Sequence, residues 1–70
     1  MSEIIAPMAA KVFELKVKPG DKIEEGEEVL VLEAMKMEMP MVAEEAGTVK
    51  EVRCAVGDAV EAEAVLIILE

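Results

Sequence analysis

The chain lacks most of the side chains on which small enzymes and stapled folds depend. It contains no histidine, tryptophan or tyrosine and a single phenylalanine. Its one cysteine, Cys54, has no partner for an internal disulfide. Neither a cystine nor a histidine-based metal site can hold the fold together. The 70 residues must therefore be stabilised by packing, as one small domain.

Basic residues are also scarce. The chain has 7 lysines and arginines against 16 aspartates and glutamates, which gives a formal charge of −9. This balance argues against binding to nucleic acid or to anionic lipid, because both depend on a cationic surface. No apolar run approaches the length of a membrane span, and residues 1–4 have no basic segment leading into an apolar stretch. We therefore expect no membrane insertion and a cytoplasmic protein, or the matured form of an organellar one.

The sequence contains an internal repeat. When the chain is shifted by about 37 positions, a period typical of repeats, Gly20-Asp21 falls on Gly57-Asp58 and Leu32-Glu33 falls on Leu69-Glu70. The other identical pairs are Ala6 with Ala43, Ala9 with Ala46, Val12 with Val49, Glu14 with Glu51 and Glu24 with Glu61. The sequence thus predicts a single domain over residues 1–70, with repeat halves at about 4–33 and 41–70.

Each half has the pattern of β structure. Residues 29–32 and 65–69 are short apolar runs rich in branched side chains, which favour strands over helices. Pro19-Gly20-Asp21 is typical of a turn, because proline presets φ and glycine accepts a positive φ. No stretch keeps the spacing of apolar residues that an amphipathic helix requires. The pattern predicts strands joined by tight turns.

The alternation of apolar residues slips once in each half, at the matched positions 12–15 and 49–52. A matched slip of this kind predicts a β-bulge in each half. It also places Cys54 where the first half has Val17. Cys54 is therefore expected to be a small, inert hydrophobic residue of the core.

These elements predict an all-β domain of two antiparallel halves, each with three or four strands and related by an approximate two-fold axis. Such halves can close into a flattened barrel or sandwich, which removes exposed strand edges. A single open sheet would leave the apolar last strand, residues 65–69, unprotected. The closed arrangement is therefore favoured.

The connection between the halves, residues 34–40, is short enough to form a hairpin. Lys36 is predicted at or beside the tip of this hairpin, on the side of the molecule away from the chain termini. The connection lacks the Asn-Gly or Asp-Gly that a two-residue hairpin turn prefers, and broken local rules tend to mark functional sites. A lone lysine on a turn is ordinarily a solvated group, but this position favours a lysine that is modified.

The residues around Lys36 resemble a known family. Glu-Ala-Met-Lys-Met at 33–37 is similar to the attachment motif of biotinyl domains, the biotin carboxyl carrier proteins of biotin-dependent carboxylases and decarboxylases. The resemblance covers nearly the whole chain, including residues 6–8, 17–21, 47–49 and 57–60. It implies a flattened eight-stranded barrel of two four-stranded antiparallel sheets, with biotin attached covalently to Lys36 on a hairpin turn.

The chain departs from this family at Ala10, where glycine is usual, at Glu44-Glu45, where Ala-Pro is frequent, and at Ala62-Glu63, where a Gly-Gln or Gly-Glu pair is common. We interpret these as loop positions, so the departures bear on turn conformation and stability and leave attachment unaffected. The inserted loop called a thumb in some acetyl-CoA carboxylase carriers and a Pro/Ala-rich linker are also missing. The length is similar to that of small stand-alone attachment proteins, which favours a free-standing carrier over an excised domain.

The resemblance implies a carrier that performs no catalysis. A biotin protein ligase would join biotin to the Lys36 amine, and the swinging biotinyl-lysine would carry carboxyl groups from a biotin carboxylase to a carboxyltransferase or a decarboxylase. The domain is expected to be monomeric in isolation. Of the two methionines beside Lys36, one is expected to fold back onto the barrel. The residues expected to form the attachment motif and to contact partners are Glu33, Ala34, Met35, Met37 and Glu38.

Three alternatives remain open from the sequence. A lipoyl carrier, or one that accepts both biotin and lipoyl groups, would share the fold, although lipoyl domains usually show Asp-Lys-Ala at the tip. An unmodified interaction module could keep the fold without the cofactor. An enzyme would need Cys54 as its nucleophile, and a buried cysteine with no base beside it is poorly suited to that role.

Overall fold

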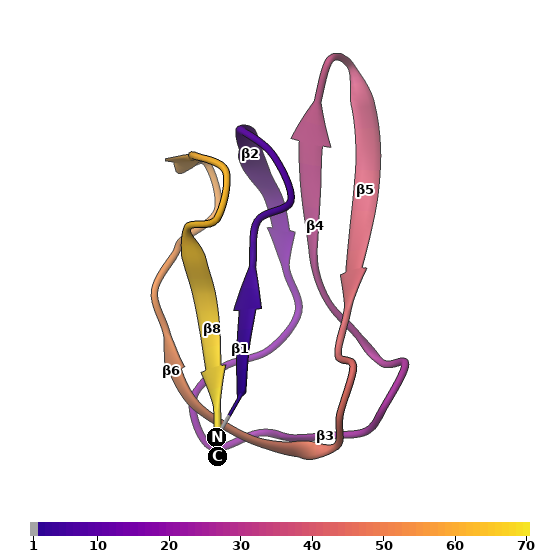
Figure 1. The fold of residues 1–70 in the computed structure, drawn as a ribbon, viewed down its shortest axis with the longest axis vertical. Coiled ribbons are helices and arrows are strands. Elements are labelled where there is room, and N and C mark those ends of the chain that lie inside the picture. The colour runs from indigo at the N-terminus through magenta and orange to yellow at the C-terminus, as the bar shows by residue number, and fades with distance from the viewer. Residues whose placement is uncertain (1) are drawn as a thin grey trace.

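The structure, a computed structural model that describes residues 2–70, consists of strands and turns without a helix in that range. Two four-stranded antiparallel sheets, with strand orders β1-β8-β6-β3 and β5-β4-β2-β7, form a flattened barrel (Figure 1). This confirms the predicted fold class. The strands are β1 (Ser2–Ile5), β2 (Ala10–Leu15), β3 (Lys22–Ile23), β4 (Glu28–Ala34), β5 (Met37–Val42), β6 (Gly47–Val52), β7 (Ala59–Val60) and β8 (Val65–Leu69).

The two repeat halves are interleaved between the sheets. Each sheet takes two strands from β1–β4 and two from β5–β8. The repeat matches β1 with β5, β2 with β6, β3 with β7 and β4 with β8, so the pseudo-two-fold axis exchanges one sheet for the other. Because the long apolar strands β4 and β8 each lie between two neighbours, their backbone groups are paired on both sides. The two halves therefore cannot form separate layers.

The core repeats in the same way. Ala6 and Ala43 are both almost fully buried, and so are Leu30 and Ile67, which occupy matching positions on the central strands β4 and β8. The largest fully buried side chains are Leu30, Leu32, Leu66, Ile67, Val12, Val29 and Val49. Each such side chain contributes about 1.5–3 kcal/mol by leaving water. Packing of branched aliphatic residues thus stabilises a chain that can form no internal disulfide.

Both predicted bulges are present. The register of β2 against β4 shifts between Val12 and Glu14, and that of β6 against β8 shifts between Val49 and Glu51. The extra residue bends the strand and increases its twist. In β2 the extra residue is Phe13, the single aromatic side chain of the chain, and it is exposed.

The two Gly-Asp turns are nearly identical. Gly20 has φ 95° and Gly57 has φ 94°, a region in which only glycine is free of strain. The amide of each glycine donates a hydrogen bond of 2.8 Å to the carbonyl of a core valine, Val49 and Val12 respectively. Each turn therefore ties one sheet to a bulged strand of the other.

One predicted loop position proved wrong. Ala10 is the first residue of β2 and lies opposite Val60 of β7, so it belongs to a strand. Ala62 and Glu63 do lie in a turn, and Glu63 has a φ of 68°. A glutamate in that conformation carries strain that glycine would avoid. The departures from the glycine pattern thus have different consequences at the two places.

Candidate functional site

The β4–β5 hairpin protrudes at the end of the molecule opposite the two chain termini (Figure 1). Ala34 and Met37 form the last pair of the ladder, so the loop consists of Met35 and Lys36 alone. The strands therefore extend into the segment 34–40 that the sequence assigns to the connection. Lys36 therefore belongs to the loop at the end of the molecule opposite the termini (Figure 1).

The loop adopts a conformation that bulky residues rarely take. Met35 has φ 52° and Lys36 has φ 64°. Two consecutive positive φ angles define a type I′ hairpin turn, which normally uses asparagine and glycine. Each non-glycine residue in this region costs roughly 1–2 kcal/mol. The hairpin tolerates the cost because its root is held in the core by Leu30 and Leu32, which are fully buried.

The amine of Lys36 has no hydrogen-bond or ion-pair partner among residues 2–70. Its side chain is exposed. Lys16, directly after β2, shows the contrast. Its Nζ lies 3.0 Å from Glu28 and 3.6 Å from Glu14, and the hydrogen bond to Glu28 is the main reason that its pKa is raised. Lys16 thus braces two strands, whereas the Lys36 amine is available to a reaction partner.

Both methionines beside Lys36 are exposed. Met35 is 90% exposed and Met37 is 68% exposed, so the expectation that one of them folds back onto the barrel was wrong. The reason is that β5 is an edge strand and the hairpin tip extends beyond β2, which leaves no surface to cover them (Figure 1). Met39 and Met41, nearer the root, do pack against the core. The two tip methionines form a flexible apolar surface beside the lysine.

Glu33 and Glu38 are directly opposite each other on β4 and β5, one pair below Ala34 and Met37. Like charges in this arrangement destabilise a sheet. Neither carboxylate forms an ion pair within the described chain. Within residues 2–70, the tip therefore carries two carboxylates that form no ion pair, close to the Lys36 amine.

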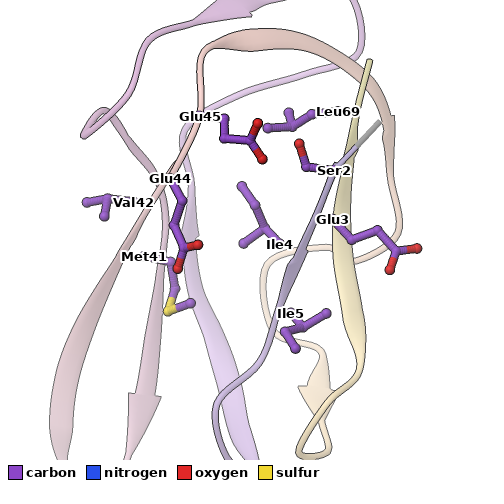
Figure 2. A pocket seen from close by; sticks show the side chains of 9 residues that line it. All are labelled: Ser2, Glu3, Ile4, Ile5, Met41, Val42, Glu44, Glu45 and Leu69. Carbon is purple, nitrogen blue, oxygen red and sulfur yellow. The ribbon is translucent and has the colours of Figure 1, made fainter.

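A cavity of about 260 Å³ lies elsewhere, between the edge strands β1 and β5. Figure 2 shows the side chains of Glu44 and Glu45 directed from the chain after β5 towards β1, with Ile4 and Met41 between the strands. No group of carboxylates within residues 2–70 has the arrangement of a metal site. The cavity lies away from Lys36 and contains no lysine or arginine.

Cys54 is buried, as predicted, in the position that matches Val17. Burial raises the pKa of its thiol, and the negative charge of Asp58 adds to this effect. A raised pKa keeps the sulfur in its unreactive protonated form. Cys54 is thus unsuited to be a nucleophile.

The sequence interpretation missed a shallow groove of about 300 Å³ beside the β4–β5 hairpin, which we call the Phe13 groove. Phe13 of the β2 bulge and Val56 of the β6–β7 loop are both exposed and form its apolar part. The signal was present in the repeat, which matches the exposed Phe13 with a lysine, Lys50. The groove is lined by Lys11, Val12, Phe13, Glu33, Val56 and Gly57.

Known proteins resemble this chain in both sequence and structure. The model of the family Biotin_lipoyl, described as biotin-requiring enzyme, matches residues 2–69. The chain is 50% identical over 60 residues to the biotin/lipoyl attachment protein of Bacillus subtilis (strain 168), a match that covers 86% of this chain and 82% of that protein.

Larger proteins contain a similar segment. The mitochondrial propionyl-CoA carboxylase alpha chain of Homo sapiens is 46% identical over 69 residues, covering 99% of this chain and 10% of that protein. The crystal structure of the urea carboxylase of Kluyveromyces lactis superimposes with a TM-score of 0.90 at 28% identity, over 99% of this chain and 6% of that one. The chain thus spans about a tenth of the carboxylase alpha chain that it matches and most of the Bacillus protein.

Proposed function

The chain belongs to the Biotin_lipoyl family, and from this premise we propose that Lys36 is the residue to which biotin is joined by an amide bond. The domain is a biotin carrier and has no catalytic role of its own. When bound, biotin supplies a ureido nitrogen that can accept a carboxyl group. The protein supplies the attachment point, the protrusion that exposes it and the rigid root that holds it.

The residues present fit this group. A covalent carrier needs an accessible amine, and the Lys36 side chain is exposed and unpaired within residues 2–70. It stands at the tip of a two-residue turn far from the termini (Figure 1). This placement is the observation that carries the proposal, because a tether at a protruding tip can enter an active site without the barrel colliding with the enzyme. Carrying the group on a tether also raises its local concentration at that active site.

The tip residues are proposed as the surface that partners recognise. Met35 and Met37 offer adaptable apolar contacts to more than one enzyme. Glu33 and Glu38 add a fixed negative charge that favours basic partner surfaces. Ala34, opposite Met37, has a small side chain and therefore keeps the hairpin tip slender.

The partners proposed are a biotin protein ligase, which modifies Lys36, and the biotin carboxylase and carboxyltransferase of a carboxylase system. The formal charge of −9 would steer the carrier towards basic surfaces on these enzymes. We place the carrier in the cytoplasm, as a monomer when separated from its enzymes. No helix of residues 2–70 is long and apolar enough to cross a membrane.

The test is the intact mass of the protein after co-expression with a biotin ligase, followed by peptide mapping. We expect one biotinyl group, located on Lys36. The Lys36→Arg variant should lose the modification completely and keep its fold, because the side chain is exposed and forms no hydrogen bond or ion pair with residues 2–70. Lys18→Arg, on the exposed turn before Pro19-Gly20, is the matched control and should be modified in full.

Other outcomes would be informative in different ways. A lipoyl or octanoyl group on Lys36 would replace the biotin assignment with the lipoyl one and keep the attachment site. Biotin on another lysine would refute the assignment of Lys36. An unmodified protein in the presence of either ligase would leave the interaction module as the remaining function for this fold.

A further inference from the structure

The Phe13 groove lies beside the hairpin that carries Lys36. Its lining includes Glu33, which precedes Lys36 by three residues and lies opposite Lys11 in the β4–β2 ladder. Val12, at the floor, pairs with Leu32. The groove therefore lies three to four strand residues from Lys36, a distance on the order of 10–13 Å.

The apolar part of the groove is not required by the fold. The pseudo-two-fold axis relates Phe13 to Lys50 and Val56 to Pro19, and both matching positions are exposed. The two bulges and the two Gly-Asp turns are otherwise the same in backbone detail. The half that lies beside Lys36 thus has an exposed aromatic ring where the same backbone elsewhere accommodates a charged side chain. An exposed apolar groove of this kind marks a binding surface.

We propose that the Phe13 groove is a resting site for the bicyclic ring of biotin carried on Lys36. This inference rests on the proposed function. The thiolane part of the ring is apolar and suits Phe13 and Val56, which are 50% and 62% exposed. The ureido part has one carbonyl acceptor and two N–H donors. Lys11 can donate to that carbonyl and Glu33 can accept from an N–H, because these two residues form no ion pair with each other in the described chain.

The length of the tether fits the distance. The lysine side chain and the valeryl chain of biotin together are about as long as four residues of extended strand, on the order of 13 Å. A short flexible tether of this kind gives an effective concentration in the millimolar range. A groove with only millimolar affinity would therefore be occupied about half of the time. Such weak binding shields the ring between reactions and still releases it readily to a partner enzyme.

The test compares the unmodified and the fully biotinylated protein by ¹⁵N–¹H NMR, after mass spectrometry has established one biotin on Lys36. Biotinylation should shift the amide signals of Phe13, Val56 and Gly57 in addition to those of the hairpin tip. Nuclear Overhauser contacts should connect the Phe13 ring to the biotin ring. Capture of the biotinylated protein by avidin should be about twofold slower than for a variant without the groove, since only the free fraction reacts.

Phe13→Lys, which installs the side chain of the matching position, should remove the remote shifts and the Overhauser contacts and leave the shifts at the tip. Val42→Lys is the control, because it adds the same charge at an exposed apolar position near the root of β5 and should retain the remote shifts. Remote shifts that persist in Phe13→Lys, or shifts confined to residues 34–38 in the wild type, would overturn the groove and leave the carrier function intact. A protein without biotin on Lys36 would overturn both.

Discussion

The two halves of this domain share a backbone conformation, and they differ at the residues to which we assign a function. In both halves, an alanine, a valine and an aliphatic residue of the central strand are buried at matching positions, and the same glycine turn is bonded to the opposite bulge. Backbone hydrogen bonds also repeat at matching positions. The amide of Lys16 donates to the carbonyl of Val29 at 2.9 Å, and the amide of Arg53 donates to the carbonyl of Leu66 at 2.8 Å. The shared features are those that closing two sheets requires.

The differences lie outside this shared frame. The first half ends in β4, which turns directly into β5 through Met35 and Lys36. The first half has an exposed Phe13 where the second has Lys50, and Gly26 where the second has Glu63. Because one fold accommodates both versions, the fold cannot be the reason for the difference. The repeat thus provides an internal reference against which functional residues stand out.

The largest effect expected from this comparison is in the core. Leu30→Ala and Ile67→Ala should each lower the free energy of unfolding by about 2–5 kcal/mol, because both side chains are fully buried on central strands. The two losses should agree within about 1 kcal/mol if the halves are energetically equivalent. Urea titration followed by circular dichroism measures them, since the chain has no tryptophan or tyrosine for fluorescence.

A domain of this size is only marginally stable, so either alanine variant could unfold it altogether. Leu30→Val and Ile67→Val then give the same comparison with a loss of about 1 kcal/mol each. If one variant loses more than twice as much stability as the other, one half dominates the stability despite the matching geometry.

A smaller effect is expected where the turns differ. Gly26 and Glu63 occupy matching positions with φ angles of 84° and 68°. Gly26→Ala should lower the free energy of unfolding by about 1 kcal/mol through backbone strain alone, because an added Cβ meets no atom within 4 Å. Glu63→Gly should raise it by about 0.5 kcal/mol, since relief of strain exceeds the added freedom of the unfolded chain.

Ala62→Gly is the matched control, because it adds the same freedom to the unfolded chain at a neighbouring residue whose φ is not positive. It should destabilise the protein. Thermal unfolding of the three variants beside the wild type decides the matter. A Glu63→Gly protein that melts below the wild type would show that Glu63 contributes something that offsets its strain.

Much of this arrangement could be predicted from the sequence, because turns and alternation are local. The bulges followed from a slip in the alternation, and the place of Lys36 followed from the repeat. The interleaving of the strands could not be predicted. A repeat shows which segments are equivalent, but it does not show which strands are hydrogen-bonded to each other. The exposure of both tip methionines, Met35 and Met37, was missed for a related reason. Alternation assigns a residue to a face of the sheet, but whether that face is covered depends on how far the neighbouring strand extends.

The Phe13 groove depends on contacts between residues that are still further apart in the sequence. Phe13 and Val56 come together because the amide of Gly57 bonds to the carbonyl of Val12 at 2.8 Å. Nothing near either residue in the sequence indicates the other. The repeat did offer a partial signal, because it aligned an exposed aromatic residue with a lysine.

The smallest expected difference is between Val17 and Cys54, which fill matching core positions. Cys54→Val should change the free energy of unfolding at neutral pH by less than about 1.5 kcal/mol, because the volumes are similar. The two proteins should diverge in alkali. Burial and the charge of Asp58 raise the pKa of the Cys54 thiol above its ordinary value of 9.0. The resulting stabilisation is complete below that ordinary value and is lost as the pH rises through the raised one.

Thermal unfolding of both proteins between pH 7 and pH 11 measures this difference, because titrating lysines affect the two equally and cancel in the comparison. The wild type should lose stability relative to Cys54→Val above about pH 9. Melting temperatures that stay parallel across this range would mean that the thiol ionises as readily in the native barrel as in the unfolded chain. Cys54 would then be accessible to water, unlike Val17, and these two matched core positions would not be equivalent.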